Sequence, residues 1–438
     1  MCGEPGRNGG KGRSRERVGV PVASGFAGLL LGLAGLVLGS DLGAAPPGAS
    51  STDPEVRALW VVRTALAHPD SARHAVRRAQ EAGFNTLLVQ VRGRGDAYYW
   101  SRWEPRAEAL QARDPGYDPL AVVLEEASGT GVSVHAWVNA LLVASAVNLP
   151  EDRRHVVHAR PHLLAVPRSL ARELYSMDPT DPGYVAALAR HARERSGEVE
   201  GLYLSPAQPE AHEHLHSVWT DILDHYMVDG IHLDYIRLPS QEFDYSRGAL
   251  DRFREWVRPR ISSREWEEAN RRHVADPLAF PQAFPQHWDA FRREGVTQLV
   301  ERARWSLRQR RADALLTAAV FPDPGQASGT RFQEWAEWVG RGLLDAVAPM
   351  AYTDDDSVFR GQLTRAAEVA GAARVWAGVG IYQNSLEGAV RKARMARSLG
   401  LGGVALFSYD WAVQPEGVQA AGGPYLPRFA QEVFGGGP

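Results

Sequence analysis

The segment DGIHLDYIR, residues 229–237, contains the side chains of this chain that are best suited to chemistry. Its apolar residues predict a buried strand, and the alternation of side chains along a strand places Gly230, His232 and Asp234 on one face. Asp234 lies close to the carboxyl end of this strand, where a β/α barrel carries its catalytic groups. We therefore expect Asp234 to act on a ligand, with His232 as its orienting partner. The alternative is that Asp234 only forms an ion pair with Arg237 or holds a loop.

Apolar strand-like runs alternate with amphipathic helical stretches from Glu55 onward, which is typical of repeated βα units around a parallel sheet. The expected strands cover residues 58–63, 86–92, 132–138, 229–235, 315–321, 344–350, 375–381 and 403–409. The expected helices cover residues 71–82, 119–129, 213–227, 287–311, 331–341, 360–371 and 386–399. Eight strands with seven intervening helices predict an α/β fold of the (β/α)8 TIM-barrel type. An open dinucleotide-binding sheet is disfavoured because no GxGxxG motif follows the first strand.

Two connections of this predicted barrel are long, at residues 139–212 after the third strand and 238–286 after the fourth. Connections of this length usually carry function or small elements of their own. Both are expected to emerge at the carboxyl-end face of the barrel, where they could wall a cleft.

The composition excludes several classes of function. A net charge of −3, from 49 Lys and Arg against 52 Asp and Glu, provides no basic surface for a nucleic-acid backbone. Cys2 is the only cysteine, so neither a disulfide framework nor a thiolate metal cluster is expected.

The amino terminus is organised differently from the rest of the chain. Basic residues precede an apolar run at 18–38, and small residues and a Pro/Ser stretch follow it. This order predicts an export signal, cleaved near Ala44 or Ala45, or a retained membrane anchor, because a run of about 20 residues can span a bilayer. We expect residues 1–45 to form this segment, residues 46–54 a linker, and residues 55–434 the barrel. The protein is then periplasmic or extracellular, either free or attached to the membrane.

Multi-residue motifs run in order through residues 55–412. They read GFNTLLVQVRGRGDAYYWSRWEP, GYDPLAVVLEEASGTGVSVHAWVNA, YLSPAQPEAHEHLHSVWTDILDHYMVDGIHLDYIRLP, LLDAVAPMAYTDD and GVALFSYDW. Together they resemble the bacterial glycosyl-hydrolase-like family ten. The resemblance implies a TIM barrel in exported or envelope-associated proteins related to glycoside hydrolases. Some relatives are associated with hydrolysis of peptidoglycan glycan strands.

The chain departs from the resembled patterns directly after Asp234. Members of the family commonly carry a second acid at the next position, which here is Tyr235. Chitinase-type barrels place their proton donor, a glutamate, two residues beyond the last aspartate, where this chain has Ile236. A substrate-assisted chitinase mechanism is therefore not expected.

Hydrolysis of a glycosidic bond generally needs two carboxyl groups. Asp234 supplies one, and Asp96, just past the end of the second strand, is the strongest candidate for the other. Glu104 and Asp354 are the next candidates. The alternative for Asp96 is a turn after Gly95. For the run of three acids that begins at Asp354, the alternatives are a solvated loop and a site for a hard cation.

Polar and aromatic side chains at the ends of the predicted strands form an expected sugar-binding layer. Planar rings can stack on the apolar face of a sugar while Arg and Asn bind its hydroxyls. The alternative for each aromatic residue taken alone is core packing. The expected substrate-binding residues are Gln90, Arg92, Trp137, Asn139, His232, Arg237, Tyr352, Tyr382 and Tyr409.

The run HEHLH contains three closely spaced histidines, His212, His214 and His216. Positions i, i+2 and i+4 do not share one helical face, so a solvated helix start is a better interpretation than a zinc site. No GxSxG motif supports acyl hydrolysis. No metal and no cofactor are expected.

These observations predict an exported glycoside hydrolase that acts on a bacterial envelope polysaccharide, such as peptidoglycan glycan strands. Asp234 and Asp96 would be its catalytic carboxyl pair, and the polysaccharide its partner. A non-catalytic glycan-binding barrel is the main alternative. A hydrolase or lyase with a metal at the acidic loop is a weaker one.

Overall fold

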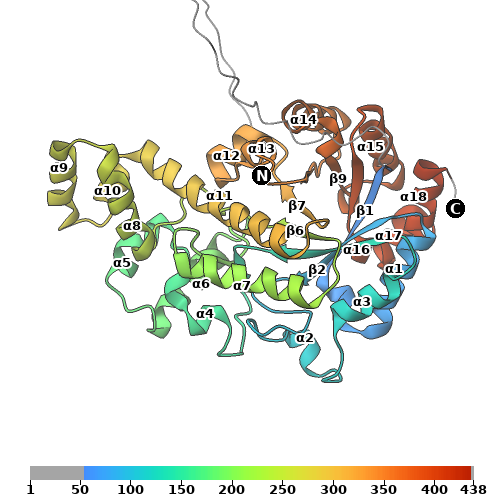
Figure 1. Ribbon diagram of the computed structural model, residues 1–438, viewed down its shortest axis with the longest axis horizontal. Coiled ribbons are helices and arrows are strands. Elements are labelled where there is room, and N and C mark those ends of the chain that lie inside the picture. Colours follow the sequence, from blue (N-terminus) through green and yellow to red (C-terminus); the bar gives the residue numbers. More distant parts are fainter. Residues whose placement is uncertain (1–53, 436–438) are drawn as a thin grey trace, which may run out of the picture. The chain divides into compact units, whose positions relative to one another are not determined.

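Eight parallel strands form a closed barrel in the computed structural model, which describes residues 54–435 (Figure 1). In their order around the sheet the strands are β8 (Ala346–Pro349), β7 (Leu315–Val320), β6 (Gly230–Asp234), β3 (Ser133–Asn139), β2 (Thr86–Arg92), β1 (Val56–Val61), β10 (Gly403–Phe407) and β9 (Trp376–Gly380). Parallel bridges from Val347 to Val375 and from Met350 to Gly378 join the last strand to the first. The predicted (β/α)8 barrel is therefore confirmed.

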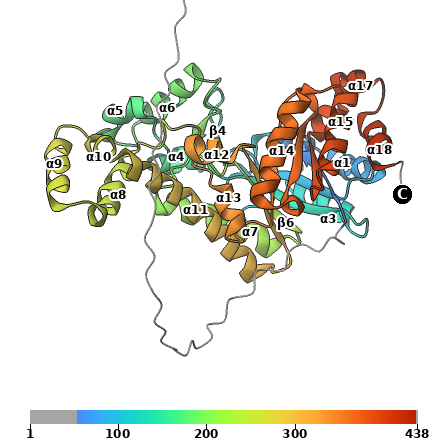
Figure 2. The same ribbon diagram turned by 90° about the horizontal axis from the view of Figure 1, so that it is seen from above.

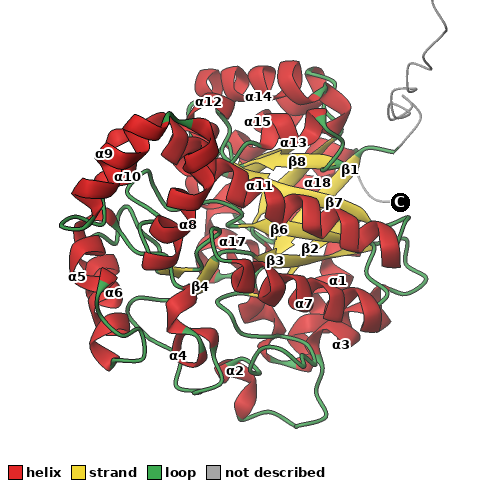
Figure 3. Cartoon of the chain, turned by 60° about the vertical axis from the view of Figure 1, so that its left-hand side comes forward, coloured by secondary structure: helices red, strands yellow, loops and turns green. Residues whose placement is uncertain are grey.

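Helices surround the strands on the outside, as Figure 3 shows. Those that lead from one strand toward the next, or follow the last strand, are α1 (Pro69–Glu81), α3 (Pro119–Ala127), α7 (Pro209–His225), α11 (Pro285–Arg310), α13 (Trp335–Gly340), α14 (Asp356–Ala370), α15 (Leu386–Ser398) and α18 (Tyr425–Phe434). Proline at the first position fits four of these starts, because its missing N–H has no helical partner there. All seven predicted helices are present, and α18 is an addition.

Apolar side chains pack on both faces of the sheet, which explains why the strands read as continuous apolar runs. The inside of the barrel combines the large rings of Trp60, Trp137 and Trp376 with alanines. The larger core lies between the sheet and the surrounding helices. Both faces of each strand are thus buried, and only the strand ends can present polar groups to a ligand.

The two long connections both carry elements of their own. The first contains the helices α4 (Val156–Ala159), α5 (Ala171–Tyr175) and α6 (Pro182–Glu194) and the antiparallel pair β4 (Leu142–Ala144) and β5 (Leu202–Tyr203). The second contains α8 (Arg247–Val257), α9 (Ser263–His273) and α10 (Ala279–Ala283). These three helices pack with the start of α11 around a separate aromatic core, and Figures 1 and 2 show them well away from α15 and α18.

The amino-terminal predictions fall on residues 1–53, which lie outside the described residues. Among residues 54–435, no helix is both long and apolar enough to cross a membrane. The export signal or anchor therefore stays a prediction.

Two histidines are buried inside the barrel. His232 Nε2 accepts a hydrogen bond from Trp60 Nε1 at 3.2 Å, and its Nδ1 is hydrogen-bonded to Thr317 Oγ1 at 2.9 Å. His135 Nδ1 lies 2.7 Å from where a Cβ on Gly230 would stand, which explains the glycine in β6. Burial lowers the pKa of His135 to about 4 and that of His232 to about 3. Both imidazoles are therefore neutral.

Acid should destabilise the barrel through these two histidines. The unfolded chain protonates them near the ordinary pKa of about 6.5, whereas the folded chain does so only near pH 4 and pH 3. Stability is therefore lost as the pH falls from about 7 toward 4. Between pH 7 and pH 5, the unfolding free energy of His135→Leu should fall by about 2 kcal/mol less than that of the unmodified chain. Urea denaturation at the two pH values measures both.

The exposed His74 offers a matched control. His74→Leu should leave the loss between pH 7 and pH 5 unchanged. An equal loss in His135→Leu and the unmodified chain would contradict the role given to the buried imidazole.

Candidate active site

Asp234 is the last residue of β6 and is 7% exposed. The N–H of Tyr235 donates to Asp234 Oδ1 at 2.6 Å, and the N–H of Ala140 donates to the Asp234 carbonyl at 2.7 Å. Burial raises the pKa of Asp234 to about 6, although the charge of Arg237 lowers it. Asp234 can therefore hold and release a proton close to neutral pH, as a general acid must.

Tyr235 turns the chain immediately after this carboxyl group. Its φ of 49° lies in the left-handed region, which a bulky residue rarely adopts. The Leu141 N–H donates to the Tyr235 carbonyl at 3.1 Å, so β3 and the residues that follow it hold this conformation. Strained backbone of this kind is concentrated at functional sites.

Glu200, on the loop between α6 and β5, is the carboxylate that acts on Asp234. Glu200 Oε1 accepts from Arg237 Nη2 at 2.8 Å, and Oε2 accepts from Tyr203 Oη at 2.6 Å. Burial alone would raise the pKa of Glu200, but Arg237 and Tyr203 hold it below its ordinary value. The negative charge of Glu200 in turn contributes to the raised pKa of Asp234. The two carboxyl groups are thus electrostatic neighbours whose pKa values move in opposite directions.

Glu200 was not among the site residues predicted from the sequence. The residue belongs to the first long connection, and only its closeness to the motif that begins at Tyr203 gave a signal. Arg237 was expected to bind substrate, but its side chain is buried and engaged with Glu200. Its guanidinium also lies 4.6 Å from the ring centroid of Tyr235. Arg237 therefore serves as the counter-ion of Glu200.

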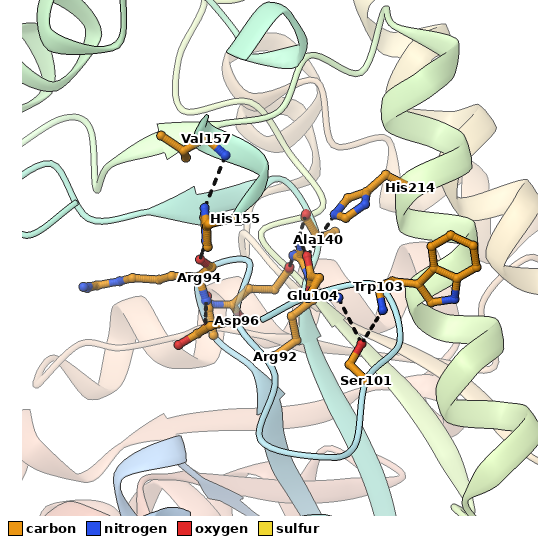
Figure 4. Close-up of polar contacts among 12 residues, drawn as sticks. Arg92, Arg94, Asp96, Ser101, Trp103, Glu104, Ala140, His155, Val157 and His214 are labelled. Carbon is orange, nitrogen blue, oxygen red and sulfur yellow. Dashed lines mark hydrogen bonds and ion pairs between the residues drawn. The ribbon is translucent and has the colours of Figure 1, made fainter. Parts of the chain in front are cut away.

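Asp96 forms a local turn after β2. Its Oδ1 accepts from the backbone N–H of Arg94 at 2.8 Å (Figure 4). Gly95 has a φ of +71°, and a Cβ there would lie 2.8 Å from His155 Nε2. Asp96 thus forms the turn that was the alternative to a catalytic role. Its catalytic role stays a prediction.

Glu104 belongs to a buried triad in which it forms an ion pair with Arg92 and a hydrogen bond with His214 (Figure 4). Arg92 Nε and Nη2 donate to its two oxygens at 2.8 and 2.7 Å, and His214 Nε2 lies 2.9 Å from Oε1. Burial would raise the pKa of Glu104, but the charge of Arg92 and the bond to His214 hold it well below its ordinary value. A carboxylate held ionised in this way cannot be the proton donor.

The expectation that Arg92 and Asn139 face a ligand is corrected by their burial. Arg92 Nη1 donates to the Asn139 carbonyl and, at 3.0 Å, to the Ala140 carbonyl. Asn139 Oδ1 accepts from Trp137 Nε1 at 2.8 Å, and its Nδ2 donates to the Gly93 carbonyl at 2.8 Å. The polar groups of both side chains are thus used to position the loops of the carboxyl-end face.

Three other expectations are corrected as well. His232 cannot orient Asp234, because both of its ring nitrogens are bonded inside the barrel. Tyr409 begins the short helix α16 (Tyr409–Val413) and is buried in the outer core, so it does not reach the carboxyl-end face. His214, expected in a solvated helix start, is only 3% exposed because it binds Glu104.

The acidic loop that begins at Asp354 is structural. Asp355 caps α14 by accepting from two backbone N–H groups, and Asp356 Oδ1 binds Lys392 Nζ at 2.7 Å. In the part of the chain that the structure describes, no group of three His, Cys, Asp or Glu could hold a metal ion.

An aromatic cluster lies beside Asp234 at the top of the barrel. Its members are Trp60, Trp137, Tyr352, Tyr382 and Phe407. Tyr352 stacks on Phe407 with 5.5 Å between ring centroids, and the charge of Asp234 contributes to the raised pKa of Tyr352. Tyr382 is 43% exposed and Trp137 is buried, so the cluster runs from the barrel core to the surface. Of the predicted sugar-stacking rings, Tyr382 is thus exposed and Tyr352 is half-buried.

Gln90, the remaining predicted binding residue, is buried at the end of β2. Its Oε1 accepts from the backbone N–H of Arg63 at 3.3 Å and from Arg63 Nη1 at 3.1 Å. Gln90 therefore positions Arg63 at the carboxyl-end face of the barrel.

Curated proteins provide two examples of similar sequences. Glycosyl hydrolase YngK of Bacillus subtilis (strain 168) is 26% identical over 261 residues, which cover 52% of this chain and 45% of that protein. Glycosyl hydrolase DigH of Escherichia coli (strain K12) is 27% identical over 283 residues, which cover 62% of this chain and 55% of that protein. The chain spans about half the length of the curated relatives it matches.

Solved structures show the same fold. The PgaB (BpsB) glycoside hydrolase domain from Bordetella bronchiseptica has a TM-score of 0.60 at 16% identity, covering 87% of this chain and 99% of that one. A β-galactosidase from the psychrophilic Marinomonas ef1 has a TM-score of 0.55 at 14% identity, covering 85% of this chain and 58% of that one. The family model described as glycosyl hydrolase-like 10 matches residues 55–396, which is most of the chain. The resemblance of the motifs is thereby confirmed, and the chain belongs to the glycosyl hydrolase-like 10 family of proteins related to glycoside hydrolases.

Proposed function

We propose that the protein hydrolyses O-glycosyl bonds in a bacterial envelope polysaccharide, such as the glycan strands of peptidoglycan. The observation that carries the proposal is the pair Asp234 and Glu200, neighbouring carboxyl groups whose pKa values are moved apart. A glycoside hydrolase needs one protonated and one ionised carboxyl group, and opposite environments provide them. Membership of a glycoside-hydrolase-related family supports the reaction class.

In the proposed mechanism Asp234 gives its proton to the glycosidic oxygen as the bond from that oxygen to the anomeric carbon breaks. Glu200 stays ionised and faces the positive charge that develops on the sugar. It either attacks the anomeric carbon or takes a proton from the attacking water, depending on the separation of the carboxyl groups. Tyr352 and Tyr382 supply ring faces for the sugar beside the reacting bond.

The proposal also includes export of the protein. An envelope polysaccharide lies outside the cytoplasm, and the basic and apolar composition of residues 1–45 is that of an export signal or membrane anchor. The polysaccharide is then the partner of the barrel.

A non-catalytic glycan-binding barrel is the second candidate. Tyr235 occupies a position where a second acid was expected, and both oxygens of Glu200 are already hydrogen-bonded. Binding of glycan strands without any product would favour this candidate.

Substitution of the two carboxyl groups tests the reaction. Asp234→Asn and Glu200→Gln should each lower kcat for cleavage of peptide-free peptidoglycan strands by about 100-fold or more, because each removes one half of the acid and base pair. Products are identified by mass spectrometry. The exposed Glu198, two residues before Glu200 and paired with Arg195, provides the matched control Glu198→Gln, which should retain activity.

Asp96→Asn distinguishes the two possible partners of Asp234. Retained activity in Asp96→Asn together with loss in Glu200→Gln supports Glu200. The reverse result would return the role to Asp96, and undiminished turnover in Asp234→Asn would remove Asp234 from the mechanism.

The pH dependence of kcat/KM should report both groups. Activity requires Asp234 to be protonated, so it should fall as the pH rises through about 6. It also requires Glu200 to be ionised, so the acid limb should lie below the ordinary pKa of a glutamate. Measurement from pH 3 to pH 9 checks both limbs, and an activity that stays constant above pH 6 would contradict the role of Asp234.

Asp234 should also cost stability when it is ionised. Its folded pKa of about 6 lies above the ordinary 3.8, so its favourable contribution is complete below pH 3.8 and is lost as the pH rises through about 6. The unmodified chain should therefore lose about 3 kcal/mol of unfolding free energy between pH 3.5 and pH 8 that Asp234→Asn does not lose. Urea denaturation at the two pH values measures the difference, and an equal effect at both would show that the carboxyl group is not strained by burial.

A further inference from the structure

Arg63 and Arg94 lie at the carboxyl-end rim of the barrel, directly after β1 and β2. Arg63 is held by the two hydrogen bonds to Gln90 and is half-buried. A Cβ on Gly93 would lie 2.6 Å from Arg63 Cδ and 2.9 Å from its Nε. Glycine at the start of the GRGD turn is therefore needed for Arg63 to lie across this loop.

Arg94 follows on the same loop and is also half-buried. Figure 4 shows its side chain pointing away from Glu104 and His214. Its guanidinium forms no hydrogen bond or salt bridge with any residue between 54 and 435. Burial and the positive charge of Arg63 lower the pKa of Arg94, while Tyr235 and Asp96 raise it. The two guanidinium groups are therefore near neighbours of like charge.

The charged groups that act on Arg94 are Arg63 and Asp96. The charge of Asp96 raises the pKa of Arg94 and that of Tyr98. The charges of Arg63 and Arg94 lower the pKa of Tyr98. Arg237, by contrast, is neutralised by Glu200. Holding two half-buried guanidinium groups of like charge near each other is unfavourable unless an anion joins them.

We propose that Arg63 and Arg94 bind a carboxylate carried by the glycan, on a sugar next to the one whose bond is cleaved. This inference rests on the proposed function and names its substrate as an acidic glycan. The planar guanidinium group is well matched to a carboxylate, which it can bind through two parallel hydrogen bonds. Only β3 lies between β2 and β6, so the rim at β2 is about 10 Å from Asp234. That separation suits a neighbouring sugar.

Binding measurements on the full chain test the inference, with Asp234→Asn in every protein to prevent turnover. The probes are peptide-free peptidoglycan strands, the same strands with their carboxylates converted to amides, and a neutral N-acetylglucosamine oligosaccharide. Arg63→Gln and Arg94→Gln should each weaken binding of the carboxylate strands about tenfold, and should leave binding of the amidated strands and the neutral oligosaccharide unchanged. Two variants are used so that the result does not depend on the folding of either one.

The exposed Arg153, on the connection after β3, supplies the matched control. Arg153→Gln removes the same charge and should leave all three affinities unchanged. The inference is overturned if the Asp234→Asn chain binds carboxylate and amidated strands equally well, or does not bind the carboxylate strands. It is also overturned if the arginine variants lose equal affinity for the carboxylate and the amidated strands.

Cleavage and binding separate this inference from the proposed function. If the unmodified chain cleaves strands but does not distinguish carboxylate from amide, the inference fails and the function stands. If it distinguishes them without cleaving any strand, the proposed function fails and the carboxylate site stands.

Discussion

A buried triad, the Arg92–Glu104 ion pair with His214 hydrogen-bonded to it, holds the carboxyl-end face together. It joins the end of β2, the loop that follows it, and the first turns of α7. Arg92 also binds the carbonyls of Asn139 and Ala140, and the N–H of Ala140 binds the carbonyl of Asp234. The position of the candidate acid thus depends on the triad through one intervening residue. Removing Arg92 or Glu104 would leave the buried charge of the other unpaired, which costs about 3–5 kcal/mol.

On the same face Arg237 pairs with Glu200 and not with Asp234. Arg237 is close enough to lower the pKa of Asp234, and a direct ion pair would hold that carboxyl group ionised. Glu200 and the rings of Tyr235 and Phe321, at 4.6 and 5.1 Å, instead surround the Arg237 guanidinium. Burial therefore dominates at Asp234, and ion pairing dominates at Glu200. Two carboxyl groups in one site acquire different proton affinities in this way.

The barrel could be predicted from the sequence because strand and helix periodicities are local properties. Asp234 could be located for the same reason, since it ends a strand. Glu200 could not, because its place depends on how the whole first long connection folds. Tyr409 was misplaced because the last strand was expected to run through residue 409, whereas β10 ends at Phe407 and the chain turns into α16. Arg92 was predicted to bind substrate because the alternation of side chains along a strand shows the face on which a residue lies. It does not show which groups the side chain hydrogen-bonds.

Tyr235 stands where the family pattern predicts an acid, and this affects the charge near Arg94. Its phenol is near Arg94 on one side and near Arg237 on the other. A carboxylate at this position would neutralise Arg94 and would add a second negative charge beside Asp234. A neutral ring instead leaves the pKa of Asp234 to be set mainly by burial and adds no negative charge beside Arg94. Where an acid is expected, tyrosine thus favours a site in which the anion comes from the ligand.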